Sequence, residues 1–250
     1  MNIQSKTLIV NGQKLHYYEL GRGTPILFLH GGRVNALTFK KFLLLLSKSY
    51  TVITPDIPGY GRSFTPNAVW SFKEYGDFFN DFLSVLNIGK ISVIGYSMGG
   101  GVAINLAINS DKVDKLVLID SSGVRKPKNI HLYHDARRLL FYFTHLNYFG
   151  AFLSLLKSYI SYLWKHRFNL SHIRRIRQQC FNEANKNILS KISVKSLVLW
   201  GDKDSIYPLD IAHALQNRIP NSTLHVLNGN HDWLIYKPIM GVSQIRDFLN

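Results

Sequence analysis

Runs of apolar residues recur along the chain at intervals that suit buried strands. Near-continuous apolar runs are typical of a parallel sheet whose two faces are both covered by helices. They predict strands at Pro25–His30, Thr51–Thr54, Ile91–Ile94, Val113–Ile119, Ser196–Trp200 and Thr223–Leu227. A hairpin of Leu8–Val10 and Gln13–Leu20 is predicted before them, because Asn11-Gly12 suits a two-residue turn in which both residues have positive φ.

The segments between these runs have the spacing of amphipathic helices. In Phe72–Leu86, apolar residues return every three or four positions, as on one buried helix face. Helices are also predicted at Leu37–Leu46, Gly100–Ile108, Leu209–Asn217 and Pro238–Leu249. The alternation of strands and helices predicts an α/β protein with a doubly wound, mostly parallel sheet of eight strands and an antiparallel start.

The alternation stops between Ser121 and Ser193. Residues 122–193 are therefore separated from a core that is formed by residues 1–121 and 194–250. Within this insertion, Leu139–Trp164 is dense in Leu, Phe and Tyr and predicts a helix with one apolar face. That face is expected to carry Phe149, Phe152, Leu153, Leu156, Ile160 and Leu163.

One short stretch carries most of the chemical information. Residues 95–99 read Gly-Tyr-Ser-Met-Gly, directly between a predicted strand and a predicted helix. A serine in this position occupies a tight, strained turn that lifts its hydroxyl clear of the sheet, and the flanking glycines remove side chains that would clash. Ser97 is therefore the candidate nucleophile.

A serine hydroxyl needs a base, an acid that orients the base, and donors for the oxyanion that forms. His231 lies in a Gly/Asn-rich loop after the last predicted strand, and Asp204 follows the strand that ends at Trp200. The expected oxyanion donors are the backbone N–H groups of Met98 and of Gly32.

These motifs resemble the α/β-hydrolase superfamily, in the chain order Ser…Asp…His. The matching stretches are His30–Gly32, Asp56–Ser63, Gly95–Gly99, Trp200–Asp204 with Pro208, and Gly229–His231. The resemblance covers about Thr7 to Phe248, apart from the insertion. It implies the α/β-hydrolase fold, with residues 122–193 as a helical cap over the nucleophile.

Carried over residue by residue, the resemblance makes Ser97 the nucleophile, His231 the general base and acid, and Asp204 the orienting acid. Asp202 and Asp120 are competing acids, and Asp204 is preferred because it matches the second aspartate of the family's stretch. Such a centre needs no metal and no cofactor. Three residues around it are expected to contact substrate, namely Arg33, Tyr96 and Trp233.

The expected reaction is hydrolysis of a carboxylic ester with an apolar acyl or aryl group, through an acyl-enzyme on Ser97. A carbon–carbon hydrolase acting on meta-cleavage-type diketones is the close alternative, because its relatives share the same motifs. A low-turnover small-molecule receptor on the same fold is an alternative of another class.

Composition adds limits on partners and compartment. The formal net charge is +15, but no nucleic-acid-binding fold is visible, so no nucleic-acid partner is expected. Apolar and basic residues occur together in the insertion, which leaves peripheral contact with anionic membranes open. The chain has no apolar run long enough for a spanning helix, no signal-peptide pattern, and Cys180 alone as cysteine, so a cytoplasmic protein is expected.

Overall fold

A computed structural model of the chain describes residues 2–123, 140, 148–167 and 186–250. One eight-stranded sheet runs through it, in the order β1-β2-β4-β3-β5-β6-β7-β8. The strands are β1 (Gln4–Val10), β2 (Gln13–Leu20), β3 (Pro25–Leu29), β4 (Thr51–Pro55), β5 (Ile91–Tyr96), β6 (Val113–Ile119), β7 (Lys195–Gly201) and β8 (Ser222–Leu227).

The strand directions match the predicted fold class. β2 pairs antiparallel with both β1 and β4, and every other neighbouring pair from β4 to β8 is parallel. Strand β4 lies on one side of β3, and β5 to β8 then follow one another in order on the other side of β3. The prediction of a doubly wound, mostly parallel sheet with an antiparallel start is therefore confirmed.

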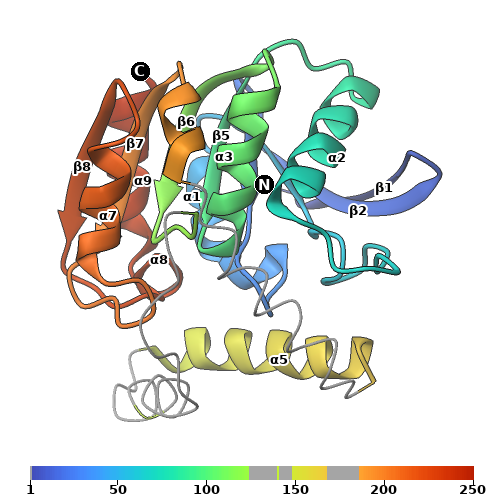
Figure 1. The fold of residues 1–250 in the computed structure, drawn as a ribbon. Helices are drawn as coiled ribbons and strands as arrows, with labels where there is room; N and C mark the ends of the chain where they lie inside the picture. Colours follow the sequence, from blue (N-terminus) through green and yellow to red (C-terminus); the bar gives the residue numbers. More distant parts are fainter. Residues whose placement is uncertain (1, 124–139, 141–147, 168–185) are drawn as a thin grey trace.

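Helices cover both faces of this sheet (Figure 1). The described helical segments are η1 (Ala36–Phe39), α1 (Lys40–Leu46), α2 (Phe72–Val85), α3 (Met98–Asn109), α5 (Phe149–Lys165), η3 (Lys186–Lys191), α7 (Leu209–Gln216), α8 (Trp233–Tyr236) and α9 (Pro238–Leu249). The predicted helix at 37–46 is split into η1 and α1, because Asn35 caps a short first turn by accepting a bond from the backbone N–H of Thr38.

Alternation along each strand divides the core into two layers. In β3, Leu27 and Leu29 pack with α2, α3 and α7, whereas Ile26 and Phe28 pack with α1, α8 and α9. Successive side chains of a strand point to opposite faces, so a fully apolar strand supplies both layers. The near-continuous apolar runs of the sequence are explained by this double burial.

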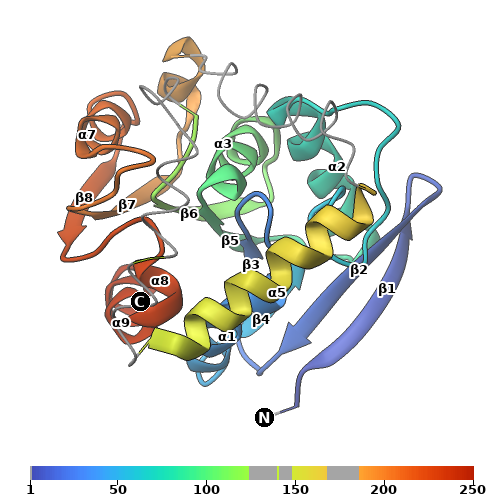
Figure 2. The ribbon, with the colours of Figure 1, turned by 90° about the horizontal axis from the view of Figure 1, so that it is seen from below.

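Helix α5 lies across the edge of the sheet where the parallel strands end (Figures 1 and 2). Its buried positions are Ala151, Ser158 and Tyr162, and none of them belongs to the predicted apolar face. Phe149, Leu153 and Ile160 of that predicted face are 46%, 48% and 47% exposed. Because α5 is apolar around most of its circumference, periodicity alone did not distinguish the two faces.

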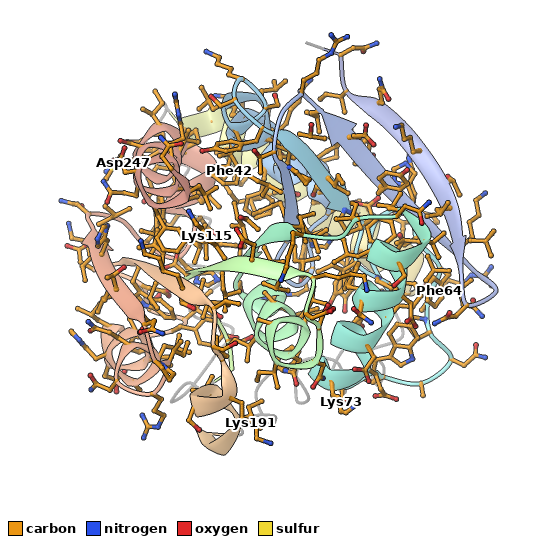
Figure 3. The ribbon with its side chains drawn as sticks, turned by 90° about the horizontal axis from the view of Figure 1, so that it is seen from above. Phe42, Phe64, Lys73, Lys115, Lys191 and Asp247 are labelled. Carbon is orange, nitrogen blue, oxygen red and sulfur yellow. The ribbon has the colours of Figure 1, made fainter. Side chains whose placement is uncertain are left out.

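At the opposite end of the strands, a lysine side chain ties the C-terminal helix to the sheet. Figure 3 views the molecule from this end, where Lys115 of β6 lies near α9. Its Nζ donates to the main-chain oxygens of Leu249 at 2.6 Å and of Phe248 at 3.3 Å. The end of α9 is thereby held against the sheet.

Cys180 and most of the basic residues of 122–193 lie outside the described residues, as does much of the predicted cap. Among the helices that the structure describes, none combines the length and the apolar composition that crossing a membrane requires.

Candidate active site

Ser97 stands at the turn between β5 and α3. Its backbone has φ 53° and ψ −119°, a strained conformation for a residue other than glycine. The turn is fixed on both sides: the N–H of Ser97 donates to the oxygen of Ile119 at 2.9 Å, and its carbonyl accepts from the N–H groups of Gly100 and Ser122. The strain is therefore held by hydrogen bonds to the neighbouring strand and helix.

The glycines on either side of this turn are required by space. A Cβ atom at Gly95 would lie 2.5 Å from the oxygen of Gly99, and one at Gly99 would lie 2.2 Å from the oxygen of Leu29. Both contacts are with backbone, which cannot move aside easily. The Gly-x-Ser-x-Gly pattern thus follows from the packing of β5, α3 and β3.

The predicted triad residues are brought together from three loops. Ser97 Oγ lies 3.1 Å from His231 Nε2, and His231 Nδ1 lies 2.7 Å from Asp204 Oδ2. His231 and Asp204 are each 5% exposed. Since Nδ1 donates to the carboxylate, Nε2 is free to accept the proton of the serine hydroxyl.

Asp204 is held as a carboxylate acceptor by its own loop. Its second oxygen, Oδ1, accepts from the backbone N–H groups of Ile206 at 2.7 Å and Tyr207 at 2.9 Å. With His231 these make three donors on one side chain. These hydrogen bonds fix the orientation of the carboxyl group toward the imidazole.

Tyr96 was expected to contact substrate, but the structure places it behind the histidine loop. Its hydroxyl donates to the main-chain oxygen of His231 at 2.7 Å, and its side chain is buried between Phe39 and the imidazole ring. A side chain in this position orients His231 rather than lining an open pocket. No local sequence pattern indicates this hydrogen bond, because its acceptor is a main-chain oxygen.

The two other residues that were expected to contact substrate differ in placement. Trp233 begins α8 and has no exposed surface, with its ring against Gly201, Gly229 and Gly241; it does not line an open pocket in this structure. Arg33 is half-buried beside the nucleophile turn, has φ 64°, and lies 5.8 Å from the ring of Tyr159 in α5.

The expected oxyanion donors lie close to each other at the same turn. A Cβ atom at Gly32 would lie 3.4 Å from Met98 Sδ, so these two residues are neighbours. Within the described residues, neither the N–H of Gly32 nor that of Met98 donates a hydrogen bond. Two unengaged N–H groups beside a serine hydroxyl have the chemistry that a developing oxyanion requires.

The loop that carries Gly32 is shaped by two buried side chains. His30 Nδ1 donates to the oxygen of Gly31 and Nε2 accepts from the N–H of Ile57, while burial lowers the pKa of His30 and keeps it neutral. Asp56 accepts from His16 Nδ1 and from the N–H groups of Ala36 and Arg62. Both are therefore structural residues of the loops around the site.

Helix α5 roofs this region and touches it through aromatic rings. Tyr162 stacks on Tyr60 with centroids 5.4 Å apart, and the hydroxyl of Tyr60 lies 3.3 Å from Met98 Sδ. Ser158 Oγ bonds Thr38 Oγ1 at 2.7 Å, and Lys165 Nζ donates to the oxygen of Ser63. Sequence reasoning did not identify Tyr60 or Tyr162, since no local pattern indicates a contact between residues so far apart in the chain.

Three buried acceptor side chains meet at the centre, namely Asp120, Asp204 and His231. One oxygen of each carboxyl group and one ring nitrogen of the histidine all lie within 4.8 Å of one another. Both oxygens of Asp204 already accept hydrogen bonds from N–H groups, and His231 Nδ1 is one of the donors. This arrangement is that of a hydrogen-bonded acid and base rather than of a set of metal ligands.

Comparison with known proteins agrees with the fold and the motifs. The chain is 38% identical over 122 residues to an uncharacterized protein of Mycobacterium bovis, a match that covers 48% of this chain and only 36% of that protein. It is 25% identical over 259 residues to the 2-hydroxy-6-oxo-6-(2'-aminophenyl)hexa-2,4-dienoic acid hydrolase of Metapseudomonas resinovorans, covering 96% of this chain and 86% of that one.

A solved structure and a family match complete the comparison. The fold superposes on a thermophilic esterase from Thermogutta terrifontis with a TM-score of 0.78 at 22% identity, covering 98% of both chains. Residues 26–243 match the alpha/beta hydrolase family. With the sheet order, the strained serine turn and the converging loops described above, this chain belongs to the alpha/beta hydrolase family.

Proposed function

We propose that this protein is a serine hydrolase that cleaves carboxylic esters with an apolar acyl or aryl group through an acyl-enzyme on Ser97. One observation carries the proposal: Ser97 Oγ, the His231 ring and the Asp204 carboxylate form a continuous hydrogen-bonded chain. The nucleophile, its base and the group that orients the base are thus at contact distance without any rearrangement.

The reaction follows from this geometry. His231 Nε2 takes the proton of Ser97 as Oγ attacks the ester carbonyl, and the tetrahedral oxyanion accepts from the N–H groups of Gly32 and Met98. The imidazolium, stabilised by Asp204, gives its proton to the leaving alcohol. Water then repeats the sequence on the acyl-enzyme and releases the acid. One such oxyanion donor typically contributes about 3 kcal/mol to the lowering of the barrier.

The surroundings of Ser97 support an apolar acyl or aryl group. Met98 and the rings of Tyr60 and Tyr162 lie on the side of the turn toward α5, and α5 itself is rich in Leu, Phe and Tyr. Apolar side chains around a few aimed polar groups are typical of small-molecule sites. A roof of this kind also keeps bulk water from the acyl-enzyme.

Carbon–carbon hydrolysis of a meta-cleavage-type diketone is the second candidate. It is supported by the match over 96% of the chain to a hydrolase named for a hexa-2,4-dienoic acid substrate. Such substrates carry a carboxylate, and Arg33 next to Gly32 is a cation in a suitable place. The same serine, histidine and aspartate would serve either substrate.

The decisive experiment compares the purified protein with Ser97→Ala. A fluorophosphonate should label the unmodified protein and not the variant, and p-nitrophenyl esters from acetate to decanoate together with a hydroxy-oxo-dienoate should be assayed for turnover. Ester hydrolysis that disappears in Ser97→Ala supports the proposal. Turnover of the dienoate alone favours the second candidate, labelling without turnover favours a receptor, and ester turnover retained by Ser97→Ala contradicts the proposal.

A further inference from the structure

A second buried acid lies behind the Asp204–His231 pair and has no part in the mechanism above. Asp120 follows the last residue of β6 and is completely buried. Its Oδ1 accepts from the backbone N–H of Gly201 at 2.8 Å, which ties the end of β6 to the end of β7. Its other oxygen, Oδ2, has no hydrogen-bond partner within the described residues.

The carboxyl groups of Asp120 and Asp204 accept different numbers of hydrogen bonds. Asp204 receives three N–H donors, from Ile206, Tyr207 and His231. Within the described residues, Asp120 has one well-formed hydrogen bond, from Gly201, and the indole N–H of Trp233 lies near it without forming a second. A buried carboxylate with a single donor is costly, and two carboxylates this close repel each other. The geometry therefore assigns the negative charge to Asp204 and a proton to Asp120.

We propose that Asp120 is a positioning residue of the hydrolase centre: a second acid that stays neutral while Asp204 is charged and supplies the charge opposite His231 when Asp204 cannot. The inference rests on the proposed function, because it concerns the same imidazole. Its basis is that a carboxyl oxygen of Asp120, a carboxyl oxygen of Asp204 and a ring nitrogen of His231 all lie within 4.8 Å of one another.

The groups that face Asp120 agree with this assignment. Burial, and after it the charge of Asp204, raises the pKa of Asp120 well above its usual range. Asp232, from the turn before α8, adds repulsion, while the N–H of Gly201 and the indole of Trp233 act in the opposite direction. The phenol of Tyr236 in α8 is also near, and burial raises its pKa to about 12, so it stays neutral.

Loss of the Asp204 charge should therefore lower the pKa of Asp120. In Asp204→Asn the repulsion is gone, so Asp120 gives its proton to solvent at lower pH and its carboxylate stabilises the imidazolium that forms on His231. Removal of the acid from such a triad typically costs about 10⁴-fold in kcat. Here we expect Asp204→Asn to keep at least about ten times the activity of Asp204→Asn/Asp120→Asn.

The test measures ester turnover from pH 5 to 10 in Asp204→Asn, in Asp204→Asn/Asp120→Asn and in the matched control Asp204→Asn/Asp202→Asn. Asp202 is a suitable control because its Oδ1 accepts from the N–H of Gly229, a bond that an amide oxygen also accepts. The expected residual activity of Asp204→Asn rises with pH as Asp120 ionises. The rise should persist with Asp202→Asn and vanish with Asp120→Asn. Equal residual activity in all three would overturn the proposal.

A second measurement is independent of turnover. Infrared spectra of the unmodified protein at pH 7 should contain the carbonyl band of a buried protonated carboxylic acid, which is absent in Asp120→Asn. If that variant does not fold, Asp204→Asn should lose the band at lower pH than the unmodified protein. A missing band overturns the inference while Ser97→Ala can still uphold the proposed function. Conversely, the band can be present in a protein whose turnover does not depend on Ser97.

Discussion

The hydroxyl of Tyr96 donates to the main-chain oxygen of His231, 135 residues away in the chain, at 2.7 Å. Tyr96 immediately precedes Ser97, so one end of the nucleophile turn holds the loop that carries the base. The separation between Oγ and Nε2 is thus set partly by a side chain that neither takes nor gives a proton in the proposed reaction. An error of about 1 Å in such a geometry can cost about 10²-fold in rate.

Tyr96→Phe should consequently lower kcat for ester hydrolysis by about tenfold while KM changes little. The free energy of unfolding should fall by about 1 kcal/mol, the usual net worth of a buried hydrogen bond. Tyr50→Phe is the control, because Tyr50 is also nearly buried but its hydroxyl faces Asn250, far from the site. A kcat for Tyr96→Phe equal to that of Tyr50→Phe would contradict the orienting role.

Gly99→Ala should prevent the nucleophile turn from forming as it does here. The added Cβ would lie 2.2 Å from the oxygen of Leu29, so β3 and α3 must separate. We expect a loss of about 3 kcal/mol or more in unfolding free energy, measured by urea denaturation. Gly89→Ala, where a Cβ meets nothing within 4 Å, should unfold at nearly the original urea concentration; similar midpoints for the two variants would refute the packing argument.

Tyr162→Ala should remove the contact by which helix α5 packs on Tyr60 beside the Ser97 turn. Without the ring that stacks on Tyr60, the position of Tyr60 and through it of Met98 is less well fixed. We expect kcat/KM to fall more for aryl and long-chain esters than for acetate. Ile160→Ala removes an exposed side chain from the same helix and should leave the acyl-chain profile unchanged. An unaltered profile in Tyr162→Ala would show that α5 does not select the acyl group.

The stability of the protein should depend on pH through Asp120. Since burial raises the pKa of this carboxyl, the unfolded chain loses the Asp120 proton at lower pH than the folded chain. In that interval the folded state binds more protons, so the contribution to stability is full below the unfolded pKa and is lost as pH rises toward the folded pKa.

Asp120→Asn removes this titration. The melting temperature of the variant, relative to that of the unmodified protein, should therefore increase between pH 4 and pH 8, as followed by circular dichroism. Asp202→Asn, at an exposed position, serves as the control and should show a constant difference. A difference for Asp120→Asn that stays constant over this range would mean that Asp120 is ionised in the folded protein.

Much of the fold could be predicted because the central strands of the sheet are buried on both faces. Runs such as Leu116–Ile119 must then be apolar throughout, and their order with the intervening helices restricts the topology to a few choices. Helix α5 shows where this reasoning fails. Apolar residues lie on both its core-facing and its exposed sides, so the choice between faces depends on contacts with Thr38 and Tyr60 that no local pattern contains.

The candidate site was predictable to the extent that its geometry is local. The turn at Ser97 is defined by residues 95–99, and the loops with Asp204 and His231 each follow a strand whose end lies at the same edge of the sheet. Tyr96 was assigned to substrate because it adjoins the nucleophile, whereas its partner is a carbonyl oxygen, which carries no residue identity. The neighbours of Asp120 likewise come from separate segments and became visible only in three dimensions.

Tyr60 belongs to two parts of the protein at once, since one side of its ring supports α5 and its hydroxyl reaches the residue after the nucleophile. Substitutions in α5 that admit a different acyl group would therefore also shift Met98, whose N–H is a proposed oxyanion donor. Under the proposed function, selectivity and chemical rate are then linked properties, and a successful change of substrate by mutation in α5 should require a compensating change at position 60.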